Sequence, residues 1–186
     1  MAQTFDIAAF KTKIETTSDK LTSIIKQAHK FKVSDEEITE AVDFLSKDME
    51  RKPAGECLQK AACFGYIKLA NLLLDKGVNI NTRDREKNTP LINACHTRHY
   101  DIAKMLVERG AFIDAKNKYK WSALKYTCLS NNIEFAKYLL EKGADTGVIS
   151  MDGKQNVIAK IISKDDGRYT DMLKYLRTVR ESLQKK

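Results

Sequence analysis

Cysteine and histidine residues near the middle of the chain are the residues whose types could hold a metal ion. Cys95, His96 and His99 lie close together, and Cys63 and Cys128 occupy neighbouring copies of a repeat described below. Thiolate and imidazole groups are common zinc ligands, but structural zinc sites usually take ligand pairs separated by two residues, and no cysteine pair here has that spacing. We therefore expect no metal and no cofactor, with Cys95 and Cys128 packed inside the protein as small apolar side chains.

Acid–base or nucleophilic catalysis would require a base beside a nucleophile. The three histidines are His29, His96 and His99. His29 is far in sequence from every cysteine, and we expect His99 to be solvated in a turn next to Arg98. The sequence shows no phosphate-binding loop, dinucleotide fingerprint, zinc-protease helix or nucleophile elbow. We predict that the chain is not an enzyme and has no catalytic residues.

Any such side chain must be positioned by helices that recur along the chain. Three Leu-rich segments end at Gly77, Gly110 and Gly143, which are separated by 33 residues each time. Within each segment the apolar residues follow helical spacing, and a basic residue in the last turn is followed by glycine, which favours a left-handed helix end. The same helix is therefore predicted three times.

A shorter helix is predicted upstream of each of these, with Leu58, Leu91 and Leu124 at matching positions. Thr89 provides an N-cap for the middle copy, and Pro90 suits the first helical position. We expect these three leucines, together with Leu73, Leu106 and Leu139 of the second helices, to form a stacked core. These six leucines are the predicted interior of the stack.

The 33-residue period, Thr89-Pro90-Leu91 followed by Ala94, and the Gly110-Ala111 and Gly143-Ala144-Asp145 segments resemble the ankyrin repeat family. The sequence departs from the family pattern in two ways. The His that usually follows Thr-Pro-Leu is Ile92 in one copy and Lys125 in the next. The Gly between the two helices is present as Gly65 in the first copy, and Arg98 and Asn131 replace it in the next two copies. Asn tolerates a left-handed turn better than Arg does, so the turn at Arg98 is the less favourable of these two.

The resemblance implies an all-α solenoid of helix-turn-helix units with β-hairpin-like loops and a concave binding surface. We place the array at residues 53–183, with units at about 53–83, 84–116 and 117–149 and a degenerate unit at 150–183. In that last unit, Val157, Ile158 and Ile161 suggest the first helix, and the segment 171–176 suggests the second. Residues 184–186 form a basic tail.

Residues 1–52 are predicted to form an N-terminal helical cap, because a solenoid exposes an apolar face at each end. Helices are expected at about 5–15, at 18–31 and from Ser34, where Glu37 completes a capping box. The alternative is an independent helical hairpin that binds a partner.

The positions that do not build the core in this family lie at the hairpin tips and on the exposed side of the first helix. Trp121 is the only tryptophan and has Tyr119 two residues away, and aromatic residues dominate interface hot spots. The alternative is that Trp121 folds back over its own first helix. The predicted partner-binding residues are Arg85, Glu86, Asn88, His96, Thr97, Lys118, Tyr119, Trp121, Tyr126, Leu129 and Ser130.

Six basic residues stand in two successive hairpin loops, interspersed with Asp84, Glu86 and Asp114. These cations would attract an acidic protein partner. The cations are Arg83, Arg85, Lys87, Lys116, Lys118 and Lys120. We predict a non-catalytic protein-binding adaptor or scaffold; the alternative is a nucleic-acid-binding module in which Trp121 and Tyr119 stack on bases.

Composition bounds the class of protein. The 186 residues are 42% hydrophobic and 31% charged, which excludes a disordered chain, and no apolar run is long enough to span a membrane. Four scattered cysteines indicate reduced thiols without disulfides, and residues 1–13 lack the pattern of a leader peptide. We expect a cytoplasmic or nuclear protein that binds neither membrane nor small-molecule substrate.

Overall fold

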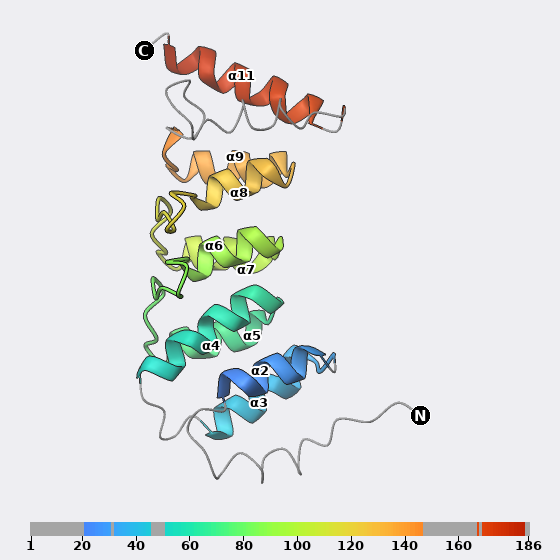
Figure 1. Cartoon of the computed structure of the whole chain (residues 1–186), viewed down its shortest axis with the longest axis vertical. Coiled ribbons are helices and arrows are strands. Elements are labelled where there is room, and N and C mark those ends of the chain that lie inside the picture. Colours follow the sequence, from blue (N-terminus) through green and yellow to red (C-terminus); the bar gives the residue numbers. More distant parts are fainter. Residues whose placement is uncertain (1–20, 31, 46–50, 147–166, 168, 185–186) are drawn as a thin grey trace.

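Paired helices stack along one axis in the computed structural model, which describes residues 21–30, 32–45, 51–146, 167 and 169–184 (Figure 1). The helices within these residues are α2 (Leu21–Lys30), α3 (Asp35–Leu45), α4 (Arg51–Phe64), α5 (Ile67–Asp75), α6 (Pro90–Thr97), α7 (Tyr100–Glu108), α8 (Ala123–Leu129), α9 (Ile133–Glu141) and α11 (Thr170–Gln184). No strand occurs among them. The described part of the chain is therefore all-α, as predicted.

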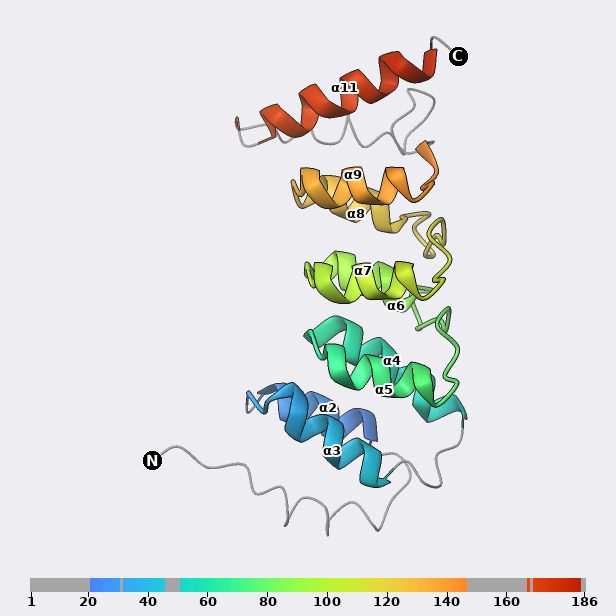
Figure 2. The same ribbon diagram turned by 180° about the vertical axis from the view of Figure 1, so that it is seen from behind.

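The helices form two layers that run the length of the stack. Helices α2, α4, α6 and α8 pack against one another in the first layer, and the second layer contains α3, α5, α7 and α9 (Figure 2). The long loops that follow α5 and α7 project together from one edge of the stack (Figure 1). We call the segments 83–88 and 116–121 within these loops the fingers.

Helices α6 and α8, the first helices of two successive units, each begin at a hydroxyl cap. The Thr89 side chain accepts from the Ile92 amide, with Pro90 at the first helical position, as predicted. Ser122 does the same for α8 by accepting from the Lys125 amide. These caps fix the point at which each finger turns into a helix.

The second helix of each unit ends at a left-handed glycine. Gly77, Gly110 and Gly143 have φ angles of +81°, +85° and +88°. In the first of them the Val78 amide donates to the Leu73 carbonyl at 3.1 Å and the Gly77 amide donates to the Leu74 carbonyl at 2.9 Å, which is a Schellman motif. The 33-residue glycine spacing therefore marks helix ends, as predicted.

The turn between the two helices is left-handed in all three copies, whether or not the residue is glycine. The φ angles are +86° at Gly65, +67° at Arg98 and +61° at Asn131. The Arg98 turn is closed by the His99 amide, which donates to the Ala94 carbonyl at 2.9 Å. A side chain in this conformation costs about 1–2 kcal/mol, which the packed helices on either side of the turn offset.

The core follows the predicted leucines. All six are at most 1% exposed: Leu58, Leu73, Leu91, Leu106, Leu124 and Leu139. They are joined by small residues of the first helices, such as Ala94 and Cys95, which let neighbouring units approach closely. The buried residues form two clusters, one around Leu58 and Leu73 and the other around Leu91, Leu106, Leu124 and Leu139. Met105 packs against both clusters, so the interior is continuous across α4 to α9.

The N-terminal pair α2 and α3 packs on α4 and α5. Ile25, Ile38 and Val42 are buried in one cluster with Leu58 and Leu69. The predicted capping box is present, because the Glu37 amide donates to Ser34 Oγ at 3.3 Å and the Ser34 amide donates to Glu37 Oε2 at 3.1 Å. The expected helix at 5–15 lies outside the described residues.

Asp35 joins this pair to the next unit. Its carboxylate accepts from the Lys68 amide at 2.7 Å and the Leu69 amide at 3.2 Å, both in the first turn of α5. An acid at a helix N-terminus satisfies amides that have no partner within the helix. The packing and this contact support the N-terminal cap, which stays a proposal.

At the other end, α11 covers α9 with Met172, Leu173 and Leu176, which are buried. The segment predicted as the second helix of the degenerate unit therefore lies within α11. The residues predicted for its first helix, Val157, Ile158 and Ile161, lie outside the described residues. None of the described helices has the length and apolar character that a bilayer span requires.

Candidate functional site

The two fingers are closed in the same way by polar side chains that accept from their own backbone. Asp84 Oδ1 accepts from the Glu86 and Asn88 amides, both at 2.8 Å. Asn117 Oδ1, one repeat later, accepts from the Tyr119 and Trp121 amides, both at 3.0 Å. Each finger is thus a preformed turn with its tip residues pointed away from the core.

The fingers are also joined to each other. The Lys118 amide donates to the Glu86 carbonyl at 3.0 Å, and the Arg83 guanidinium donates to the Lys116 carbonyl at 3.1 Å. The Lys118 ammonium forms an ion pair with the Glu86 carboxylate, and this hydrogen bond holds the pKa of Glu86 below its ordinary value. The two fingers therefore form one surface.

A buried polar ladder lies beneath the fingers. The Asn93 amide group donates to Gln59 Oε1 at 2.6 Å and to Asp84 Oδ2 at 3.2 Å. The Asn117 amide group donates to Asn88 Oδ1 at 2.9 Å. Because unsatisfied buried polar groups are costly, this ladder fixes the register of one finger on the next.

The ladder continues to Tyr126 on α8. The Asn117 amide group also donates to the Tyr126 hydroxyl at 3.2 Å. The Tyr126 ring lies 5.1 Å from the Trp121 ring and 4.8 Å from the His96 ring, centroid to centroid. Trp121, Tyr126 and His96 thus form an aromatic cluster that spans α6, α8 and the second finger.

Lys125 packs against the Trp121 ring of this cluster. It is 2% exposed, and its ammonium is 4.7 Å from the centroid of the Trp121 ring. A cation over a Trp face is attracted by the ring quadrupole. Trp121 itself is half-buried by these contacts, so part of its surface covers its own repeat, as in the alternative interpretation of this residue.

Tyr119 differs from Trp121 in being exposed. Its side chain is 55% exposed at the tip of the second finger, and the Lys118 ammonium lies 5.0 Å from its ring centroid. Phe112, at the base of the same loop, is 57% exposed. These are the two exposed large hydrophobic residues in the described part of the chain.

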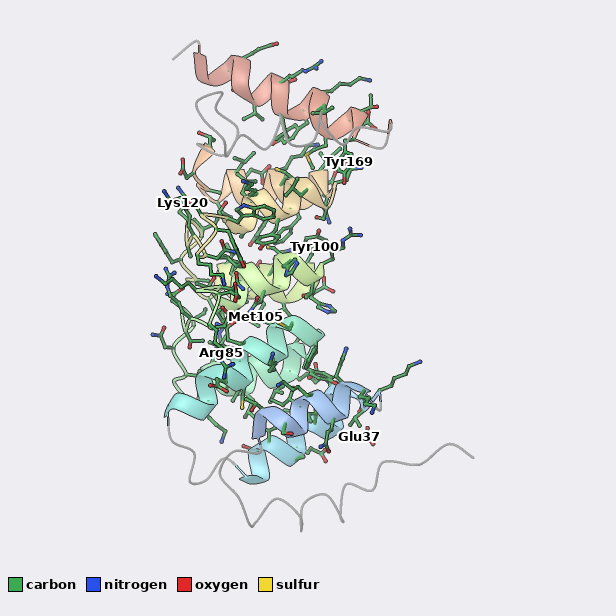
Figure 3. The ribbon with its side chains drawn as sticks, in the orientation of Figure 1. Glu37, Arg85, Tyr100, Met105, Lys120 and Tyr169 are labelled. Carbon is green, nitrogen blue, oxygen red and sulfur yellow. The ribbon has the colours of Figure 1, made fainter. Side chains whose placement is uncertain are left out.

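The predicted binding residues separate into two groups. Arg85, Glu86, Lys118, Tyr119 and Trp121 lie on the two fingers, and His96, Thr97 and Tyr126 lie on the first helices next to them. In Figure 3, the labelled Arg85 and Lys120 lie on the same edge of the stack. The structure therefore brings these residues into one region.

The other predicted residues have structural contacts. Asn88 is buried and bonded to Asp84 and Asn117, so its assignment to the contact surface needs correction: it positions the fingers instead. Ser130 Oγ donates to the Thr127 carbonyl at 2.9 Å and is paired with the Tyr100 hydroxyl. The Leu129 side chain packs against the core, and its carbonyl accepts from the Tyr169 hydroxyl at 3.1 Å.

The cysteines and histidines do not gather into a metal site in the described residues, where no group of three or more potential ligands is close enough. Cys95 and Cys128 are fully buried, and burial raises the pKa of both thiols to about 12. Such thiols stay protonated and unreactive at neutral pH.

His99 lies in the turn next to Arg98, as expected, but it is half-buried and not fully solvated. Its imidazole lies against Gly65 of the preceding repeat, where an added Cβ would come within 2.8 Å of the ring, and it forms a hydrogen bond with the backbone of Cys63. Burial lowers the pKa of His99 below its ordinary value. The residue therefore links two units.

A family model of ankyrin repeats in three copies matches residues 58–150, which is half of the chain. The chain belongs to the ankyrin repeat family. Ankyrin repeats are generally modules of protein–protein interaction, and the all-helical stack seen here is their fold. A search of the curated proteins found no match to this chain.

Sequence reasoning missed the ladder under the fingers of this ankyrin array. Asp84 and Asn117 stand 33 residues apart at matching positions, and both are short acceptors just before a turn, a pattern typical of Asx turns. That signal could have identified them. Gln59 and Asn93 carry no such signal, because their partners lie in other units.

Proposed function

We propose that this ankyrin array is a non-catalytic adaptor or scaffold that binds a protein partner with an acidic surface through its fingers and first helices. The observation that supports this most is the aromatic cluster of Trp121, Tyr126 and His96 beside the exposed Tyr119. Aromatic side chains at the edge of a rigid framework provide large contact area at low entropic cost. The proposed setting is the cytoplasm or the nucleus.

The charge on the fingers supports an acidic partner. All six finger cations are exposed, and Lys118 and Lys116 are paired with Glu86 and Asp145. Because these two acids stand among six cations, the surface carries both signs of charge with an excess of positive charge. Such a surface suits a folded or extended protein more than a continuous phosphate chain, whose binding depends on uninterrupted cations.

Site-specific photocrosslinking in cell extract tests this proposal. A photoreactive phenylalanine replaces Tyr119 on the second finger or, as a matched control, the exposed Glu134 on α9 of the same repeat. We expect the probe at 119 to capture a defined protein and the probe at 134 to capture none. Capture at 134 alone would contradict the proposed surface.

A Trp121→Ala substitution sharpens the test. It should reduce capture from position 119 because it removes the Trp121 ring from the aromatic cluster. Circular dichroism must show the same helix content as the parent, and Tyr138→Ala in the second layer serves as an aromatic control. Undiminished capture would remove Trp121 from the binding surface.

A further inference from the structure

Two finger residues adopt a backbone conformation that their side chains disfavour. Lys87 and Lys120 both have φ of +60°, in the left-handed region. They stand 33 residues apart, and Gly153 occupies the next matching position in the sequence. A side chain in this region clashes with the backbone, whereas glycine adopts it without a steric penalty.

The turns themselves do not require lysine. The Lys87 amide donates to the Asp84 carbonyl and the Lys120 amide donates to the Asn117 carbonyl, both at 2.9 Å. Glycine would donate these same hydrogen bonds. Both side chains are exposed, and among the described residues neither forms an ion pair or a side-chain hydrogen bond.

Strain that the local fold does not need is a reason to look for a function. What distinguishes lysine from glycine at these tips is a cation held outward at the same point of two neighbouring fingers. The exposed Arg85 lies two residues before Lys87, and the exposed Tyr119 directly precedes Lys120. Each tip therefore combines positive charge with a neighbour able to add contacts.

We propose that Lys87 and Lys120 are paired carboxylate-binding tips, which receive acidic side chains from an extended segment of the partner lying across the two fingers. This rests on the proposed function and specifies the chemistry of the partner. The carboxylates would be recognised by exposed ammonium groups, with Arg85 and Tyr119 contributing beside them.

The geometry of the stack sets the spacing of the acids. Helices of adjacent units pack roughly 8–10 Å apart, so matching finger positions are separated by about the same distance. An extended polyproline-type segment has three residues per turn and a rise of about 3.1 Å per residue, so every third side chain lies on one face, about 9 Å apart. The expected pattern is therefore an acid at every third residue.

Glu86 favours a peptide over a nucleic acid. Its carboxylate is half-buried in the ion pair that joins the two fingers, so it stands within the row of cations. A nucleic acid carries a negative phosphate at every nucleotide, so a strand lying across the fingers would be repelled by the Glu86 carboxylate. Separated side chains can place one carboxylate on each tip and avoid it.

The test uses a labelled peptide of four Glu-Pro-Pro triplets and the full chain, with binding measured by fluorescence anisotropy at low salt. The double variant Lys87→Gly/Lys120→Gly should bind this peptide about tenfold more weakly, the loss expected for two ion pairs. The same variant should melt about 2–4 °C higher because strain is removed. The variant Lys87→Arg/Lys120→Arg should keep the affinity.

Lys32→Gly is the matched control, because Lys32 is exposed and left-handed with φ of +56° in the turn between α2 and α3. It should gain stability while the peptide affinity stays unchanged. A peptide of the same composition with its four glutamates adjacent should bind more weakly than the spaced one. These results together would support the paired tips.

Several results would overturn the inference. They are no binding of the spaced peptide, equal binding by the double glycine variant, no gain in its melting temperature, or equal affinity for the clustered peptide. Tighter binding of a single-stranded oligonucleotide with a steep salt dependence would assign the tips to nucleic acid instead. If photocrosslinking at position 119 still captures a protein while the peptide fails, the carboxylate tips are wrong and the proposed function stands.

Discussion

At the scale of single residues, histidine illustrates how the stack changes the chemistry of a side chain. His96 and His99 are close in sequence, yet His96 is exposed beside Tyr126 while His99 is half-buried against Gly65. The difference comes from the turn between them, which directs the His96 ring to Tyr126 of the next repeat and the His99 ring to Gly65 of the preceding repeat.

The lowered pKa of His99 predicts that stability falls in mild acid. The groups that face it are His29, which lowers its pKa further, and Asp101 and the Cys63 backbone, which oppose the effect of burial. The unfolded chain binds a proton near the ordinary value of 6.5, above the pKa of the folded state. The contribution of neutral His99 is therefore fully present above that pH and is lost as the pH falls through and below it.

Urea unfolding between pH 7.5 and 5 measures this effect. We expect the midpoint of the parent to fall across this range and the midpoint of His99→Gln to fall less. His96→Gln is the control, because that ring is exposed, and it should follow the parent. Identical pH profiles for the parent and His99→Gln would show that His99 is not the group responsible.

Sequence reasoning reached the residue scale unevenly. The predicted core leucines and caps were confirmed because each depends on local spacing, such as Thr89 before Pro90. The burial of Asn88 and His99 was missed, because it arises from contacts with neighbouring units rather than from local pattern. The predicted binding surface itself stays a prediction.

At the scale of elements, glycine positions in the repeat are not equivalent. Gly65 has both a left-handed φ of +86° and a close neighbour, since an added Cβ would lie 2.8 Å from the His99 ring. Gly110 has φ of +85° but no atom within 4 Å of such a Cβ. Substitutions at Gly65 and Gly110 can therefore distinguish the cost of backbone strain from the cost of steric contact.

Gly65→Ala should accordingly destabilise the protein more than Gly110→Ala. We expect about 1 kcal/mol for Gly110→Ala from conformation alone and about 2–3 kcal/mol for Gly65→Ala, because the imidazole must also shift. The free energies of unfolding from urea titration measure the difference. Equal losses would mean that His99 moves aside freely and does not hold the α4–α5 unit to the next.

The helices were predicted correctly where the 33-residue period and the residues typical of helix ends indicate the same boundary. The second helices and their terminal glycines follow from the 33-residue spacing, and the left-handed Arg98 turn shows that packing can impose a geometry the residue disfavours. The two left-handed finger lysines could not be predicted from residue preference, because lysine does not favour such a conformation.

At the scale of the whole molecule, stability depends on how each unit is held to the next. Neighbours in a stacked array share their interfaces, so a unit at the end has one interface where an internal unit has two. The α2–α3 pair is joined to α5 through Asp35 and through the ion pair of Lys76 with Asp43 at 2.8 Å. The first contact is to backbone amides and the second is on the surface.

Asp35→Ala should therefore loosen the N-terminal pair. Removing this cap leaves two amides of α5 without their acceptor and should cost about 1–2 kcal/mol. Hydrogen–deuterium exchange should quicken in α2 and α3 while α8 and α9 stay protected. Asp43→Ala, which removes an exposed ion pair, should change exchange little; equal quickening in both variants would contradict the role of Asp35.

A partner that binds as proposed contacts one continuous surface of the fingers and the first helices. Hydrogen–deuterium exchange of the full chain, with and without the protein captured at position 119, measures this most directly. We predict added protection in residues 83–88 and 116–121 and in α6 and α8, with α7 and α9 unchanged. Protection confined to α7 and α9, with the fingers unchanged, would contradict it.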